Sequence, residues 1–216
     1  HICRGQKDHG LVRVKVCGIT NLKDAEAACR LGADALGFVF AKSPRRIDAE
    51  KARSISLKMP PYVSLVGVFV DEDIKKLLKI AEKCRIDCVQ LHGNESINYC
   101  KQLKKYYKIV KAVRIGEKKD LDGLSGYDVD AFLLDTYRPG KAGGTGEKFD
   151  WNLALRVKKL GRPVILSGGL KPRNVRGAIR KVKPYAVDVS SGVESSPGRK
   201  SMKLMKEFIQ RAKKTS

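Results

Sequence analysis

The stretch VRVKVCGITN, residues 12–21, alternates three valines with two basic side chains and a thiol, and then reaches a glycine. In a strand the valines share one face, while Arg13, Lys15 and Cys17 share the other. Strict alternation of this kind predicts a strand whose apolar face packs against other elements. The last residue of the polar face is Cys17, directly before Gly18, so the predicted strand ends in a group that can do chemistry.

Short β-branched runs of this kind recur along the chain, and each is followed by a stretch with helical periodicity. The predicted strands are 12–17, 34–40, 63–70, 87–91, 108–114, 130–135, 163–167 and 185–190. The predicted helices lie near 21–31, 48–58, 72–84, 95–106, 117–124, 150–160, 172–182 and 200–213. Strands that alternate with helices run parallel, because each helix is a crossover. Eight such units in 216 residues favour an α/β fold of the closed (β/α)8 (TIM) barrel type over an open doubly wound sheet.

The amino-terminal residues are polar and lack the apolar core of a secretory signal. We expect residues 1–11 to form a tail outside the fold and residues 12–216 to form a single barrel domain, because no linker divides them. The longest apolar runs are strand-sized, so we expect no segment to span a membrane. Six cysteines without disulfide-framework spacing favour reduced thiols and a cytoplasmic location.

The formal net charge of +22 would attract phosphorylated metabolites and nucleic acid alike. The basic residues are nevertheless dispersed over predicted helices, as in KKLLK at 75–79 and KQLKKYYK at 101–108, which is typical of solvated helix faces. A nucleic-acid module gathers charge on one patch with exposed aromatic rings, and only 6% of this chain is aromatic. We therefore expect a small-molecule substrate and no specific nucleic-acid partner.

Polar residues occupy the carboxyl ends of several predicted strands, where barrels of this type place their chemistry. Cys17 ends the first strand, Gln90 and His92 belong to the end of the fourth, and Asp135 ends the sixth. Asp188 points inward from the eighth strand between two valines. A Cys17 thiolate would act as a base if positive charge lowered its pKa, and a neutral Asp135 would act as an acid.

Each of these side chains also has a purely structural interpretation. A lone thiol often fills a core, a strand-end aspartate often caps a loop, and a histidine is often a satisfied structural group. Lys15 shares the inward face with Cys17, so it is the candidate source of positive charge. Asp188 is also predicted to face inward, and we hypothesise that it neutralises Lys15 in a buried ion pair.

Two glycine-rich turns follow the last two predicted strands, LSGGL after the seventh and VSSGVE after the eighth. In (β/α)8 enzymes these two loops often bind phosphate through backbone N–H groups. Gly168 and Gly169 let the backbone approach an anion closely, and Ser191 and Gly192 are placed to complete the cradle. A tight turn explains either loop alone, but the pair predicts a phosphate site.

These segments together resemble the phosphoribosylanthranilate isomerase family of tryptophan biosynthesis. The matching stretches are KVCGITNLKDA, GADALGFVFAKSPRRI, VGVFVDE, VQLHGNE, LLDTYRPGKAGGTGEKFDW, VILSGGLKPRNV and AVDVSSGVESSPGRK. They run in the family order from residue 12 towards the carboxyl terminus. The resemblance implies an Amadori rearrangement of N-(5-phosphoribosyl)anthranilate to the carboxyphenylamino deoxyribulose phosphate, without a metal or an organic cofactor.

The resemblance also implies roles for particular residues. Cys17 matches the general base of the family and Asp135 its general acid. Arg45 matches the guanidinium that holds the anthranilate carboxylate, with the adjacent Arg46 as the alternative in the same loop. The residues expected to bind substrate are Arg45, Gln90, His92, Gly168, Gly169, Asp188, Ser191 and Gly192.

Two rival functions follow from the same residues. Another phosphosugar barrel, such as an indole-glycerol-phosphate synthase or a histidine-pathway isomerase, would be expected to use a lysine or a pair of aspartates at the mouth. The Cys17–Asp135 pair fits neither. A phosphate- or nucleic-acid-binding barrel without turnover is the rival of a different class, and it would tolerate the loss of Cys17. The sequence is compatible with a monomer or a homodimer.

Overall fold

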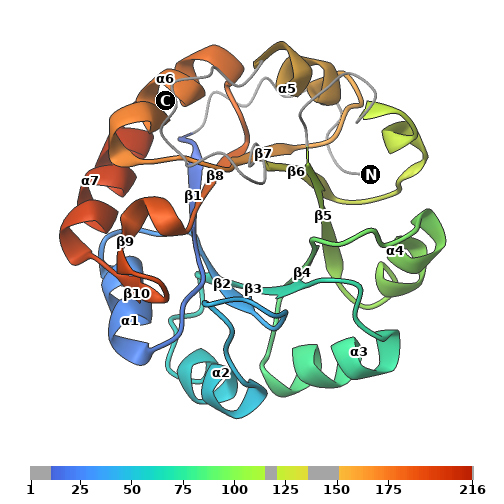
Figure 1. Cartoon of the computed structure of the whole chain (residues 1–216), viewed down its shortest axis with the longest axis horizontal. Coiled ribbons are helices and arrows are strands. Elements are labelled where there is room, and N and C mark those ends of the chain that lie inside the picture. Colours follow the sequence, from blue (N-terminus) through green and yellow to red (C-terminus); the bar gives the residue numbers. More distant parts are fainter. Residues whose placement is uncertain (1–10, 115–120, 136–150, 216) are drawn as a thin grey trace.

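Eight parallel strands form a closed barrel in the order of the sequence, as Figure 1 shows. The computed structural model describes residues 11–114, 121–135 and 151–215. The strands are β1 (Arg13–Cys17), β2 (Ala35–Val39), β3 (Ser64–Phe69), β4 (Cys88–Leu91), β5 (Lys108–Arg114), β6 (Ala131–Asp135), β7 (Val164–Ser167) and β8 (Ala186–Val189). Each end lies within one residue of its predicted position, so the (β/α)8 prediction is confirmed.

Helices ring the barrel on the outside (Figure 1). They are α1 (Leu22–Arg30), α2 (Ala49–Ser56), α3 (Ile74–Lys83), α4 (Ile97–Leu103), α5 (Trp151–Lys158), α6 (Pro172–Val182) and α7 (Met202–Lys213). Five begin after an Asn, Asp or Ser whose side chain accepts the backbone N–H three residues on, at Asn21, Asp48, Asp73, Ser96 and Ser201. Caps of this kind each contribute about 1 kcal/mol to helix stability.

The helix predicted over 117–124 is wrong where it can be compared with the structure. Residues 115–120 lie outside the described residues, and the chain after them forms only the short 3₁₀ turn η2 (Leu124–Gly126). Gly123 has φ 78°, a left-handed conformation that ends an α-helix. The predicted tail, residues 1–11, likewise falls outside the described residues except for the exposed Leu11.

An unpredicted hairpin follows the last barrel strand. After β8 the chain makes a 3₁₀ turn, η3 (Ser191–Val193), and then two short antiparallel strands, β9 (Glu194–Ser196) and β10 (Arg199–Lys200). Figure 1 shows this hairpin beside α1 and α7. It matters for the site because it carries Glu194 and Lys200.

Two apolar cores explain the alternation in the opening stretch. The outer core lies between barrel and helices and contains Val14 and Val16, both fully buried. The inner core fills the barrel with small and branched side chains: Val110, Ala112, Ala131, Leu133, Ile165 and Ala186. On β6, Phe132 and Leu134 belong to the outer core. The polar side chains that face into the barrel therefore lie above the inner core, on the side of the mouth.

Among the described residues, no helix has the length and apolar character needed to cross a membrane.

Candidate active site

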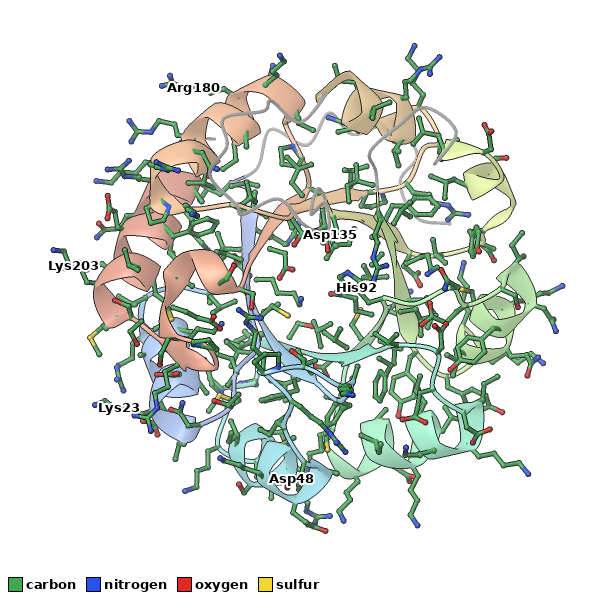
Figure 2. All side chains as sticks on the ribbon, viewed as in Figure 1. Lys23, Asp48, His92, Asp135, Arg180 and Lys203 are labelled. Atoms are coloured by element: carbon green, nitrogen blue, oxygen red, sulfur yellow. The ribbon has the colours of Figure 1, made fainter. Side chains whose placement is uncertain are left out.

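The side chains predicted to do chemistry gather at the carboxyl ends of the strands. Cys17 ends β1 and Asp135 ends β6. His92 follows β4, and its Nε2 lies 3.1 Å from Asp135 Oδ2. Figure 2 labels His92 and Asp135 inside the ring of strands. Both side chains are partly exposed, 22% for His92 and 17% for Asp135, so both are accessible to a small molecule.

Lys15 and Asp188 form the buried ion pair that the sequence suggested. Lys15 Nζ donates to Asp188 Oδ1 at 2.9 Å, and both side chains are less than a tenth exposed. Burial opposes the charged lysine, but the Asp188 carboxylate and the Cys17 sulfur together outweigh it and raise the pKa of Lys15. Asp188 Oδ2 also accepts the Ser167 hydroxyl at 3.1 Å, so both carboxylate oxygens are engaged within the barrel.

The Cys17 thiol differs from the prediction in its ionisation. Burial raises the pKa of Cys17 above its ordinary value, although the nearby Lys15 and Lys200 ammonium groups act in the opposite direction. The Asp188 carboxylate adds to the increase. Lys15 therefore lowers the pKa of Cys17 as expected, but desolvation and Asp188 outweigh the lysine charge, so the net shift of the pKa is upward. The neutral thiol is the main form near pH 7.

Space for the thiol comes from a glycine on the neighbouring strand. Gly37 of β2 is in register with Cys17 of β1. A Cβ atom at Gly37 would lie 2.7 Å from Cys17 Sγ and 3.1 Å from Lys15 Cε. A similar arrangement holds Arg45, since a Cβ at Gly18 would lie 2.7 Å from Arg45 Cδ. These two glycines let the thiol and the guanidinium approach the same end of β1.

Arg45 is held by a partner that the sequence analysis missed. Its Nε and Nη2 donate to the two carboxylate oxygens of Glu194 at 2.8 and 2.7 Å. Lys200 Nζ, on a fully buried side chain, donates to Glu194 Oε1 at 2.8 Å. Burial alone would raise the pKa of Glu194, but the hydrogen bonds from Arg45 and Lys200 hold it below its usual range. The adjacent Arg46 is exposed, so only Arg45 has a fixed orientation.

The loops after β7 and β8 lie against each other. Gly168 and Gly169 have φ of 77° and 64°, which a side chain would strain. A Cβ at Gly192 would overlap the Leu170 carbonyl oxygen, so the two glycine loops pack backbone to backbone. The Asn174 side chain donates to the Gly169 carbonyl at 3.0 Å, which connects the first loop to the start of α6.

A third buried ion pair, also missed from the sequence, supports the loop that carries His92. Lys111 Nζ donates to Glu95 Oε2 at 2.8 Å and to the Gly93 carbonyl at 2.7 Å. Glu95 in turn accepts the backbone N–H groups of Gly93 and Asp71. The sequence did contain a signal for this pair. Lys111 lies inside the apolar strand KIVKAVR, and the acidic Glu95 of HGNE follows the preceding strand. Charged residues at such positions are almost never buried unless they are paired.

The site thus offers a thiol, a carboxyl group and an oriented guanidinium at the mouth of a barrel. Within residues 11–114, 121–135 and 151–215 there is no cluster of three or more His, Cys, Asp or Glu that could hold a metal ion. A closed eight-stranded barrel with polar side chains at the carboxyl ends of its strands is the arrangement of the (β/α)8-barrel enzymes.

Comparison with known proteins gives the family within that class. The family profile described as N-(5'phosphoribosyl)anthranilate (PRA) isomerase matches residues 14–211, and the chain belongs to this family. It is 50% identical over 204 residues to the N-(5'-phosphoribosyl)anthranilate isomerase of Geobacter metallireducens, a match covering 94% of this chain and 100% of that protein.

Two solved structures of the same family superpose closely. The phosphoribosyl anthranilate isomerase of Thermotoga maritima is 48% identical, with a TM-score of 0.89 over 94% of this chain and all of the other. A second phosphoribosyl anthranilate isomerase structure contains reduced 1-(o-carboxyphenylamino)-1-deoxyribulose 5-phosphate. It is 45% identical, with a TM-score of 0.86 and the same coverage of both chains.

Proposed function

We propose that this chain is an isomerase that converts N-(5-phosphoribosyl)anthranilate into 1-(2-carboxyphenylamino)-1-deoxyribulose 5-phosphate in tryptophan biosynthesis, with Cys17 as general base and Asp135 as general acid. The observation that carries the proposal is the position of these two residues at the carboxyl ends of β1 and β6, at the same end of one closed barrel. The family match over nearly the whole chain supplies the substrate.

The reaction suits these two groups. Asp135 donates a proton to the ribose ring oxygen, the C1′–O bond breaks, and the anthranilate nitrogen becomes an iminium. The iminium makes the C2′ proton acidic, and the Cys17 thiolate removes it to give an enolamine. The enolamine then tautomerises to the ketone. The substrate nitrogen is the electron sink, so no cofactor is required, and each proton transfer typically accelerates a reaction about 10²- to 10⁴-fold.

The remaining contacts follow from the charges of the substrate. Glu194 accepts hydrogen bonds from Nε and Nη2 of Arg45. The Nη1–Nη2 edge of the guanidinium is therefore the edge that we assign to the anthranilate carboxylate. The phosphate is assigned to the backbone around Gly168, Gly169, Ser191 and Gly192, at the loops where barrels of this type often bind it. The basic surface would steer a substrate that is anionic at both ends towards the mouth.

Replacing Arg45 by Ala is expected to raise KM about 10- to 100-fold with a smaller change in kcat. The reason is the loss of a charge-assisted hydrogen bond of roughly 1.5–3 kcal/mol to the substrate carboxylate. Steady-state kinetics measure both constants. Arg46→Ala is the matched control and should behave like the parent; a large KM effect at Arg46 with none at Arg45 would move the carboxylate site by one residue.

The Cys17 thiol is expected to titrate above the range of an ordinary cysteine, because burial raises its pKa. The thiolate fraction below that pKa then grows about tenfold per pH unit. Ultraviolet absorbance of the thiolate, taken as the difference between the parent and Cys17→Ser, measures the midpoint. The Asp135→Asn variant lacks the carboxyl group, so only the thiolate fraction of Cys17 should set the pH dependence of its rate. Its residual kcat/KM should therefore rise with pH in parallel with the thiolate absorbance. A midpoint below pH 8 would contradict the ionisation described above.

The direct test of the function is a fluorescence assay of the purified protein with freshly generated N-(5-phosphoribosyl)anthranilate. Turnover consumes the substrate, so its fluorescence should change far faster than in a solution without protein. Cys17→Ala is the control for contaminating host enzyme. Equal rates with the parent, the variant and no protein would refute the proposed reaction.

We further propose a cytoplasmic location, supported by the five cysteines of the described residues, all of which are free. The assembly is expected to be a monomer or a homodimer acting on a small molecule alone, and light scattering at assay concentrations distinguishes the two.

A further inference from the structure

A chain of hydrogen bonds crosses the barrel from β1 to β6. Lys15 Nζ lies 2.9 Å from Gln90 Oε1, Gln90 Nε2 lies 3.0 Å from His92 Nδ1, and His92 Nε2 lies 3.1 Å from Asp135 Oδ2. Gln90 is 1% exposed and Lys15 is 5% exposed, so the first half of the chain is sealed from water. In Figure 2 its last two members are the labelled side chains inside the ring of strands.

The direction of every bond in this chain follows from its first member. A lysine ammonium has three donors and no acceptor, so the oxygen of the Gln90 amide must face it. The amide nitrogen therefore faces His92 and donates, which requires Nδ1 to be an unprotonated acceptor. The proton of the neutral ring is then on Nε2, and Nε2 donates to Asp135 Oδ2. The ammonium itself is kept charged by Asp188, 2.9 Å away.

The tautomer of His92 decides where the proton of Asp135 can sit. If Nδ1 carried the ring proton, the lone pair of Nε2 would face Oδ2 and would accept the Asp135 proton in a hydrogen bond. With the proton on Nε2, Oδ2 is an acceptor, and the carbonyl form of an acid oxygen accepts better than its hydroxyl form, so a proton on Asp135 is favoured on the other oxygen, Oδ1. That oxygen is the one not turned towards His92.

We infer that Gln90, oriented by Lys15, is a positioning residue that selects the Nε2–H tautomer of His92 and thereby places the transferable proton of Asp135 on Oδ1. The inference rests on the proposed function in one respect only, the use of Asp135 as the acid. Gln90 was expected from the sequence to bind substrate. The inference instead has it act on the substrate indirectly, through His92 and Asp135. Its near-complete burial and its two engaged amide atoms support that role.

The tautomer is measured first, without any substrate. The chain has three histidines, so the imidazole ¹⁵N signals of His92 are identified by their loss in His92→Gln. In the parent, Nε2 is expected to be the protonated nitrogen and Nδ1 the unprotonated one. In Gln90→Met, which removes the donor to Nδ1, the signals are expected to shift towards the other tautomer. A parent spectrum with Nδ1 protonated would overturn the inference even if the enzyme were fully active.

Kinetics then test the consequence for catalysis. Gln90→Met is expected to lower kcat about tenfold and to change KM less than twofold. Gln102→Met, an exposed glutamine on α4, is the matched control and should leave both constants unchanged. Because His92→Gln has no imidazole tautomer left for Gln90 to select, adding Gln90→Met to that variant should cost less than twofold.

The double-variant comparison separates positioning from folding. An equal tenfold loss in the parent and in His92→Gln would show that Gln90 only maintains the barrel, and it would overturn the inference. A changed tautomer with unchanged kcat would overturn it as well. An inactive parent would instead refute the proposed function, while the ¹⁵N measurement would still decide the tautomer.

Discussion

Cys17→Ala is expected to lower kcat about 10³-fold, within the range of roughly 10²- to 10⁴-fold that a general base supplies. The substitution removes the group that we propose as the acceptor of the C2′ proton and leaves Lys15 and Gly37 beside an alanine. KM should stay close to the parent value, because the anionic ends of the substrate are assigned to Arg45 and the glycine loops.

The control for Cys17→Ala is Cys29→Ala on α1, which removes a half-buried thiol remote from the mouth and should keep the parent kcat. Stopped-flow or steady-state fluorescence with the same substrate preparation gives the kcat of both variants. Near-parent turnover by Cys17→Ala would mean that another group is the base. It would also favour the interpretation of the thiol as a core residue.

Asp135→Asn is expected to have an effect of comparable size on kcat, about 10²- to 10⁴-fold. The amide keeps the shape of the side chain and an oxygen that can accept a hydrogen bond from His92, but it has no acidic proton to give to the ring oxygen. The protein should therefore fold and bind normally, with unchanged KM and thermal midpoint.

Asp128→Asn is the matched control for this change, because Asp128 is an exposed aspartate paired with Lys104 and Arg162. It should leave kcat unchanged. If Asp135→Asn kept more than about a tenth of the parent kcat, Asp135 would be a loop-capping residue, and the acid would have to be sought elsewhere at the mouth.

Much of the fold could be predicted because each barrel strand requires a short, regular alternation of side chains that is visible in the sequence. Each strand alternates outer-core and inward side chains, and glycines or turn residues follow it, so strand ends were located within one residue. The Lys15–Asp188 pair could be anticipated for the same reason, since both residues interrupt apolar strands on the inward face. The positions of Cys17 and Asp135 at strand ends followed from the same alternation.

Features that depend on tertiary packing could not be predicted in this way. The strands of the β9–β10 hairpin have three and two residues, too few to show a period, so the Glu194 and Lys200 partners of Arg45 were missed. The direction of the Cys17 pKa shift depends on how completely water is excluded, which the sequence does not record. The helix predicted over 117–124 failed at Gly123, whose left-handed backbone ends the pattern.

Gly37 has no side chain, yet the site depends on it, because Cys17 and Lys15 occupy the space that a side chain there would need. A Cβ atom at Gly37 would lie 2.7 Å from Cys17 Sγ and 3.1 Å from Lys15 Cε, so a larger residue there must displace the thiol, the lysine stem or the strand. In a saturation library selected for growth without tryptophan, this codon should be as intolerant as those of the proton-transfer residues, although it contributes no functional group. Redesign of this barrel for a bulkier substrate therefore cannot gain room by changing this strand.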